Sequence, residues 1–188
     1  RDVKVFSIYE GTNAIQSLDL QMRKILMNKD MFNYSMLKKY FADTVAKAKG
    51  IVDERYVAPV ERGIAKFDEI ISMMVKQLQE GKFLALVANA TPMQQAMFPL
   101  IVAWLHLWSL TITVPKSSEL LGDAKGADRK KILETNPEAA YYNGRVLSAQ
   151  FFIGAEFPKF FGRVECVMNN EGAAIKAESE NFTGALKE

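Results

Sequence analysis

The chain has 188 residues, of which 24 are Lys or Arg and 22 are Asp or Glu, so its formal net charge is +2. This near balance argues against a protein whose main task is to bind the phosphate backbone of a nucleic acid. Hydrophobic residues make up 49% and charged residues 24%, which excludes a disordered chain, and the single cysteine and single histidine exclude an internal disulfide and a multi-cysteine or histidine-rich metal site.

The sequence opens on Arg1-Asp2 without an initiator methionine, and no charged-then-apolar leader of the signal-peptide kind follows. We therefore expect a fragment of a longer polypeptide. The lone thiol and the lack of a visible leader favour a cytoplasmic location.

The first predicted helix begins after the break at Glu10-Gly11-Thr12. The nine residues before it alternate weakly between apolar and polar side chains, as a short extended segment does. Thr12 is placed to cap the helix, because its hydroxyl can accept an unpaired backbone N–H of the first turn. Apolar residues then recur at helical spacing at Ile15, Leu18, Met22 and Ile25.

Three further helices are predicted between Tyr34 and Ala90. The first covers about 34–55 and the second about 60–80, with Pro59 either interrupting the one or opening the other. Gly81 is a natural stop because glycine adopts positive φ freely. A short helix follows over 83–90.

The stretch from Phe83 to Pro115 contains no Asp, Glu, Lys or Arg, and its one titratable side chain of another kind, His106, is counted as neutral. Within this stretch, Thr91-Pro92-Met93-Gln94 has the pattern of a capping box, which predicts a long helix over 93–114 with a bend at Pro99. Its length is near that of a membrane span. Interrupting polar side chains and the lack of a flanking Lys/Arg cluster favour a buried core helix over membrane insertion.

The last third of the chain starts with a polar connector over 115–135, with a turn of helix near 128–133. Asn136-Pro137-Glu138 combines a cap, a first-turn proline and an acid, and predicts a helix to about 170 with a kink at Pro158. The predicted fold is all-α: an antiparallel helical bundle over 29–170, preceded by the segment and helix of 1–28 and followed by a tail over 171–188.

Several single residues have both a functional and a structural interpretation. His106, between Trp104 and Trp108, can be read as catalytic or metal-ligating, but no second ligand lies at i±3 or i±4, so a hydrogen-bonded core histidine is favoured. Cys166, flanked by Val164 and Val167, is predicted to be a buried inert thiol. Core packing rather than base or cofactor stacking is predicted for the helically spaced aromatic residues Tyr141, Tyr142, Phe151, Phe152, Phe157, Phe160 and Phe161.

The most informative segment is the one that leads into the first helix. Glu10 supplies a carboxylate, Gly11 permits close approach of a backbone or ligand, and a helix N-terminus with free N–H groups follows. A carboxylate beside Ile8 and Tyr9 is placed to have its pKa raised by desolvation and to act as a general base. Taken alone, Glu10-Gly11-Thr12 also fits an ordinary loop that ends in a helix cap.

The run from Arg1 to Gln16 resembles the C-terminal signature of the acyl-CoA dehydrogenases, flavin enzymes that act on fatty-acyl thioesters. The pattern Arg-Asp-x-Lys-(Ile/Val)-x-x-Ile-Tyr-Glu-Gly-Thr-x-x-Ile-Gln is matched at every fixed position. The resemblance implies that Glu10 abstracts the α-proton of the acyl-CoA while a hydride leaves the β-carbon for FAD. It also implies that Tyr9 and Gly11 line the substrate side.

The same resemblance places Thr12, Asn13 and Gln16 near the FAD. Ala14 departs from the short- and medium-chain members of the family, where a polar residue often contacts the flavin.

The remainder resembles the additional C-terminal helical domain of the larger bacterial acyl-CoA dehydrogenases, the group that includes 3-methylmercaptopropionyl-CoA dehydrogenases. The matching segments are 88–92, 103–105, 140–145 and 151–152. The resemblance implies an acyl-CoA substrate, missing N-terminal and middle domains, a homodimer or tetramer, and electron-transfer flavoprotein as a possible partner. The isolated piece is expected to retain little FAD and to be inactive. The alternative is a non-catalytic helical module for packing, which should expose an apolar patch of several hundred Å².

Overall fold

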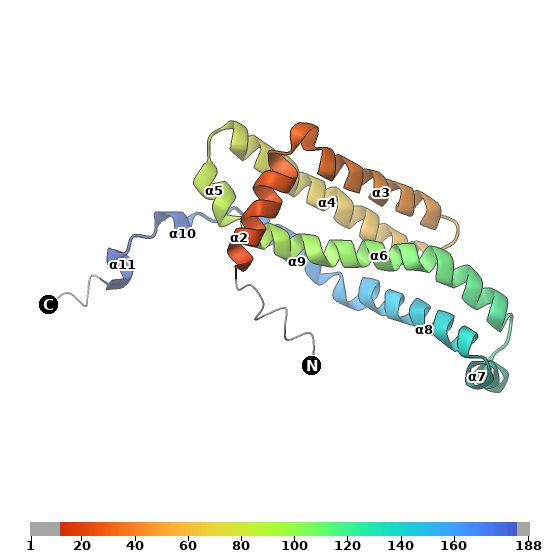
Figure 1. The fold of residues 1–188 in the computed structure, drawn as a ribbon. Coiled ribbons are helices and arrows are strands. Elements are labelled where there is room, and N and C mark those ends of the chain that lie inside the picture. Colours follow the sequence, from red (N-terminus) through yellow and green to blue (C-terminus); the bar gives the residue numbers. More distant parts are fainter. Residues whose placement is uncertain (1–11, 184–188) are drawn as a thin grey trace.

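The computed structural model describes residues 12–183, which contain no strand, so the all-α prediction is confirmed. The long helices run back and forth along one direction, as in an antiparallel bundle (Figure 1). In chain order the elements are α2 (Asn13–Leu18), the π-helix η2 (Asp19–Leu26), the 3₁₀ turn η3 (Lys29–Met31), α3 (Phe32–Ala48), α4 (Glu54–Gln79), α5 (Phe83–Ala88), α6 (Ala90–Leu121), α7 (Gly126–Thr135), α8 (Pro137–Phe151), the π-helix η4 (Phe152–Glu156), α9 (Lys159–Met168), α10 (Ala173–Lys176) and α11 (Glu180–Thr183).

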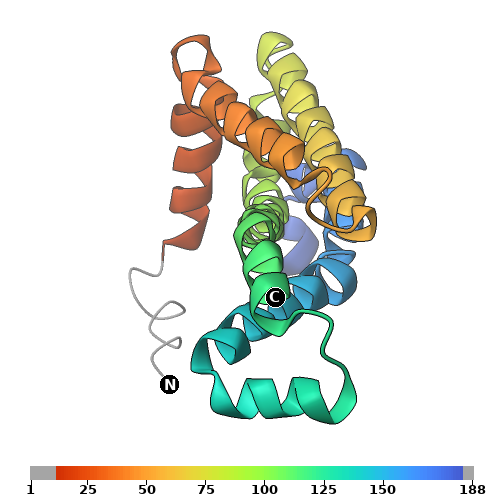
Figure 2. The same cartoon turned by 90° about the vertical axis from the view of Figure 1, so that its right-hand side faces the viewer.

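Helix α6 is the central element of the bundle. It packs against α2, α3, α4, α8 and α9, and Figure 2 shows it between α3 and α4 on one side and α8 on the other. Its inner face contributes Leu100, Leu107 and Leu110, all with no exposed surface, to the core. Large side chains that are almost fully buried in the same core are Phe41, Phe67, Met74, Phe157 and Phe160.

The boundary between the second and third predicted helices was placed too late. α3 ends at Ala48, and Gly50 at φ +86° turns the chain, so the helix does not run to Arg55. α4 then begins at Glu54, because the Asp53 carboxylate accepts the Arg55 N–H at 3.0 Å. Pro59 neither interrupts nor opens a helix but lies inside α4.

The capping box at Thr91 is also wrong. α5 ends at Ala88 and α6 already begins at Ala90, so Thr91 and Gln94 lie within the first turns of α6. α6 also continues through Pro115 to Leu121, where Gly122 at φ +53° ends it. The predicted connector over 115–135 is therefore largely helical, and α7 covers more than the single turn expected there.

The cap at Asn136 is confirmed, since its side chain accepts the backbone N–H groups of Glu138 and Ala139 at 3.0 and 3.1 Å. The kinked helix after it is divided into α8, η4 and α9. In η4 the Phe157 N–H reaches the Phe152 carbonyl oxygen five residues back, at 2.8 Å. The change of direction therefore begins before Pro158, at a π-helical turn.

Burial agrees only in part with the sequence. Cys166 is exposed, so its prediction as a buried thiol is wrong. Phe157 and Phe160 are fully buried as predicted, but Tyr141 and Phe151 are 62% and 65% exposed. Their side chains project from α8 to solvent, so helical spacing did not place every aromatic residue in the core.

By length and composition, α6 is the one helix in residues 12–183 that is able to cross a membrane. Its contacts with α2, α3, α4, α8 and α9 are those of a core helix. Only 33% of its most apolar stretch is buried, however. The other face of this helix is considered below.

Candidate functional site

The candidate site divides at residue 12. Tyr9, Glu10 and Gly11, predicted to bind substrate and to abstract the proton, lie outside the described residues. Thr12, Asn13 and Gln16, predicted to lie near a flavin, are at the start of α2 and are all exposed. The structure therefore describes α2, which carries the predicted flavin contacts, and the contacts that position α2 on the bundle.

Thr12 occupies the N-cap position of α2, with φ −103° and ψ 40°. Its carbonyl oxygen accepts the Gln16 N–H at 3.0 Å. Its side chain makes no capping hydrogen bond, contrary to the expectation for this hydroxyl. Gln16 follows Thr12 by four residues and Asn13 by three, so its side chain is a neighbour of both on α2, and all three side chains are open to solvent.

The neighbouring side of α2, which begins four residues after Asn13, is buried through a polar residue. Ser17 has no exposed surface, and its Oγ lies 2.7 Å from the Asn13 carbonyl oxygen and 2.6 Å from Gln94 Oε1 on α6. Thr91 Oγ1 donates to the same Ser17 oxygen at 3.3 Å. The two side chains of the supposed capping box thus bind α2 instead of their own helix end.

Gln21, one turn further along, is the second buried polar contact. Its Nε2 donates to the Leu86 carbonyl oxygen of α5 at 2.9 Å and lies 3.4 Å from Met74 Sδ of α4, while its Oε1 has no partner among the described residues. Ile25 continues the same side and is 3% exposed. We name Ser17, Gln21, Thr91 and Gln94 the polar seam.

The polar seam was missed in the sequence, where Ile15, Leu18, Met22 and Ile25 were expected to form one core-facing stripe. Ile25 is 3% exposed and Met22 packs partly buried against the core, as expected, but Ile15 is 64% exposed, and Ser17 and Gln21 share the buried side with Ile25. Their i, i+4, i+8 spacing was a signal that an uncharged polar face could meet the uncharged start of α6. Apolar periodicity alone does not detect such a face.

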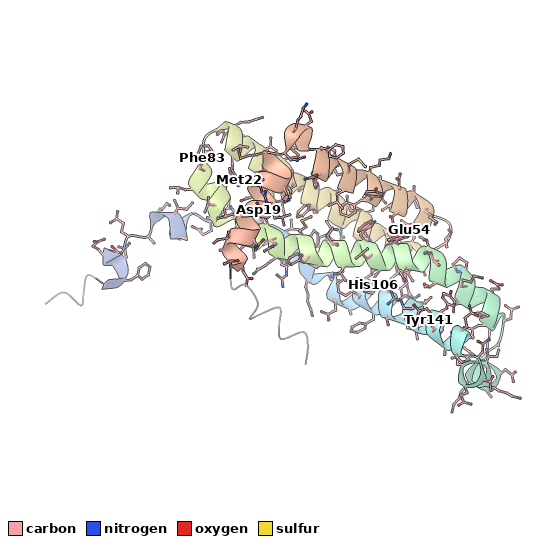
Figure 3. All side chains as sticks on the ribbon, in the orientation of Figure 1. Asp19, Met22, Glu54, Phe83, His106 and Tyr141 are labelled. Atoms are coloured by element: carbon pink, nitrogen blue, oxygen red, sulfur yellow. The ribbon has the colours of Figure 1, made fainter. Side chains whose placement is uncertain are left out.

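The segment after α2 is a π-helix, closed by the Met27 N–H on the Met22 carbonyl oxygen at 2.7 Å. Figure 3 shows Asp19 and Met22 on this crossing helix and Phe83 at the same end of the bundle. Asp19 and Arg23 form a bidentate ion pair on the outside, and the hydrogen bond from Arg23 lowers the pKa of the Asp19 carboxyl. Both carboxylate oxygens are thus paired, so Asp19 is not placed to act as a base.

Two other titratable groups are perturbed. Burial, and then the hydrogen bond to Asp68 at 2.6 Å, raise the pKa of the Tyr34 hydroxyl far above its ordinary value. Burial, and then the charge of Arg145, lower the pKa of His106. The His106 ring is half-buried and packs against the Phe152 ring, with the two ring centroids 5.0 Å apart. No cluster of metal-ligating side chains occurs in residues 12–183.

Comparison with known proteins gives the family. A family model described as "Acetyl-CoA dehydrogenase C-terminal like" matches residues 37–178. Two relatives from Syntrophomonas wolfei subsp. wolfei (strain DSM 2245B / Goettingen), each named "Butyryl-CoA dehydrogenase", are 29% identical over 183 residues and 28% identical over 186 residues. No solved structure matches the chain.

The two alignments cover 96% and 97% of this chain but only 27% and 28% of the relatives. The chain thus spans about a quarter of the length of the relatives that it matches. The family match covers α4 to α9 completely, whereas α2 and the polar seam's Ser17 and Gln21 lie before it.

Proposed function

Because the chain belongs to the acetyl-CoA dehydrogenase C-terminal-like family, we propose that it is the C-terminal part of an FAD-dependent enzyme that dehydrogenates an acyl-CoA at its α and β carbons. The observation that carries this proposal is the signature from Arg1 to Gln16, which runs into α2, a helix that is hydrogen-bonded to α6 of the family domain. The names of the two relatives support the same chemistry.

In the proposed reaction, Glu10 acts as the base. Its carboxylate takes the proton as the Cα–H bond breaks, a hydride leaves Cβ, and a C=C double bond forms in the acyl chain. Apolar neighbours such as Ile8 and Tyr9 keep the carboxylate basic, since desolvation disfavours the charged form. Tyr9 and Gly11 line the substrate side.

The residues at the start of α2 fit a flavin contact. Thr12, Asn13 and Gln16 are exposed, and their hydroxyl and amide groups can donate to or accept from a polar ligand. Bound FAD would supply the two-electron acceptor for the hydride. Ala14, which is exposed beside them, offers no such group, so these three side chains would be the ones through which α2 meets the cofactor.

The test is Glu10→Gln in the full-length polypeptide. The change keeps the shape of the side chain and removes its basicity, so turnover should fall by a factor of about 10²–10⁴ while flavin content stays the same. Glu165→Gln, on an exposed position of α9, is the matched control and should change neither. Unchanged oxidation in the Glu10 variant, or a full-length protein without flavin, would contradict the proposal.

A second measurement addresses which acyl-CoA thioester the full-length enzyme prefers. We propose the 3-methylmercaptopropionyl-CoA subgroup on the segments 88–92 and 140–145, whereas both named relatives point to butyryl-CoA. The ratio of kcat/KM for the two thioesters in the full-length enzyme decides between them. We also propose that the isolated chain binds little FAD, so stoichiometric flavin on it would contradict this part.

The non-catalytic alternative is compatible with the same polypeptide. In it, the helical bundle packs against the dehydrogenase part or a second subunit, which would give the predicted homodimer or tetramer. The bare face of α6 favours such a packing role. Electron-transfer flavoprotein as the acceptor remains a prediction from family resemblance.

A further inference from the structure

One side of α6 carries a stripe of large apolar side chains that the described residues leave uncovered. Phe98, Val102, Leu105 and Ile112 are 56%, 37%, 44% and 49% exposed. Their spacing of four, three and seven residues puts them on one line along the helix. We name these four residues the α6 stripe.

The α6 stripe continues the surface on which α2 is docked. Thr91 and Gln94, the polar-seam residues of α6, precede Phe98 at the same helical spacing and therefore lie on the same side. Figures 1 and 2 show that α2 crosses only one end of α6. The first turns of this side are therefore covered by α2, and the rest of it is bare.

A pocket of about 360 Å³ adjoins the stripe on the α3 side. Its aromatic wall is rigid, because Trp104 donates from Nε1 to Thr44 Oγ1 at 2.8 Å and Trp108 stacks on it with ring centroids 6.3 Å apart. Trp108 is itself 48% exposed. The pocket is lined by Tyr40, Asp43, Thr44, Lys47, Trp104 and Trp108.

Polar groups lie at one edge of this apolar surface and at one point within it. Asp43 and Lys47 of α3 line the pocket along that edge. Ser109, which follows Leu105 by four residues and precedes Ile112 by three, lies on the line of the stripe, and Arg145 Nη2 of α8 reaches its Oγ at 3.5 Å. An apolar strip with an aromatic pocket beside it and polar groups at its edge is common in protein–protein contacts, with the pocket taking an anchoring side chain.

We propose that the α6 stripe and its aromatic pocket are the surface on which the dehydrogenase part of the same polypeptide docks, through an apolar helical face. By the dehydrogenase part we mean the flavin- and acyl-CoA-binding region that precedes residue 12, so this inference rests on the proposed function. The α2 contact is then the described edge of a larger interface, and the uncovered stripe is its continuation.

Two observations favour this occupant over a membrane or a second copy of the chain. α2 carries the residues that the signature assigns to the dehydrogenase side, so the surface next to its contact is the first that this part meets. On the same side of α6, the polar seam is hydrogen-bonded to Ser17 of α2, so a protein segment and not hydrocarbon already covers one end of this surface.

Cysteine labelling in the full-length polypeptide tests the proposal without using activity. The exposed Cys166 is first removed as Cys166→Ser, and Leu105→Cys or Leu147→Cys is added. Leu147, on α8, is 57% exposed against 44% for Leu105, so it is a matched control. We expect the L105C variant to react with a maleimide at least about tenfold more slowly than in urea, since a covered thiol reacts only after local opening, while L147C differs little between the two conditions. V102C should behave like L105C if the latter impairs folding.

Three results would overturn the inference. The first is a native L105C rate within about twofold of the rate in urea, since a bare stripe has no opening step to slow it. The second is protection that is lost on dilution, which assigns the stripe to a second copy. The third is protection that needs vesicles of phosphatidylcholine and phosphatidylglycerol, which assigns it to a membrane. Flavin content and the Glu10→Gln rate are measured separately, so a labelled stripe in an active flavoprotein refutes the docking surface alone.

Discussion

Gly63, in the middle of α4, faces two buried phenylalanine rings without a side chain of its own. A Cβ at this position would lie 2.6 Å from Cζ and 3.2 Å from Cε1 of Phe157, and 3.3 Å from Cε1 of Phe160. Both rings are fully buried and stacked at 5.0 Å, so neither can turn away without moving the other. Gly63→Ala therefore tests whether Phe157 and Phe160 can pack against α4 only when position 63 has no Cβ.

Two opposing effects set the size of the change. Alanine is favoured over glycine in a helix interior by about 0.8–1.0 kcal/mol. Forcing an extra carbon into a packed core costs about 1–3 kcal/mol. We therefore expect Gly63→Ala to lower the free energy of unfolding by up to about 2 kcal/mol, a shift of about 2–4 °C in Tm per kcal/mol for a chain of this length.

Gly144→Ala is the matched control. Gly144 lies in α8, and a Cβ there would meet no atom within 4 Å, so alanine should stabilise by about 0.5–1 kcal/mol. Both variants are measured by urea and thermal unfolding followed by circular dichroism. Phe157→Leu should then reduce the Gly63→Ala penalty by about 0.5 kcal/mol or more, because the two sites are in contact. Equal stabilisation by both alanines would refute the reasoning.

Three further changes test the polar contacts of the core. Tyr34→Phe removes the bond to Asp68 and should cost about 1.5–3 kcal/mol in urea unfolding. Because the pKa of Tyr34 is raised, only the unfolded tyrosine ionises just above its ordinary value, so the wild type should lose stability as pH rises above about 10 by more than the phenylalanine variant does. Thr44→Val leaves the Trp104 N–H without its acceptor and should cost about 1–3 kcal/mol, and less in a Trp104→Phe background, where only the bond from Thr44 Oγ1 to the Tyr40 carbonyl oxygen is lost. The lowered pKa of His106 means that its neutral ring stabilises the fold fully above about pH 6.5 and less as pH falls below it, so His106→Asn should remove part of the fall in the urea midpoint between about pH 7.5 and 5.5. A midpoint profile that is parallel in both proteins would contradict this assignment.

The fold class could be predicted because it depends on local and periodic information. Asn136 is capped as expected, since its acceptor and the two N–H groups lie within three residues of each other. The bundle core follows from apolar residues at helical spacing, as at Phe67 and Met74. Helix ends were less certain, because Gly50 and Asp53 offered a stop and a start that competed with Pro59.

The same reasoning failed where a side chain binds a residue far away in the sequence instead of a neighbour in its own helix. Thr91 and Gln94 have the right spacing for a capping box, but their partner is Ser17, 74 and 77 residues earlier in the chain. No local pattern shows that a hydroxyl from a remote helix will be the better partner. The candidate site itself could be predicted only from the signature at residues 1–16, and its proton-abstracting half is still a prediction.

The polar seam bears directly on how precisely the proposed site is positioned. A neutral hydrogen bond contributes only about 0.5–1.5 kcal/mol net, and the unpaired Oε1 of Gln21 reduces the stabilisation further. The contribution of Ser17 and Gln21 is therefore mainly to register, because turning α2 by one residue would unpair both of them in a buried surface. An apolar contact would tolerate such a shift at small cost. Since the proposed flavin contacts Thr12, Asn13 and Gln16 are on this helix, a single register fixes where α2 presents these three side chains.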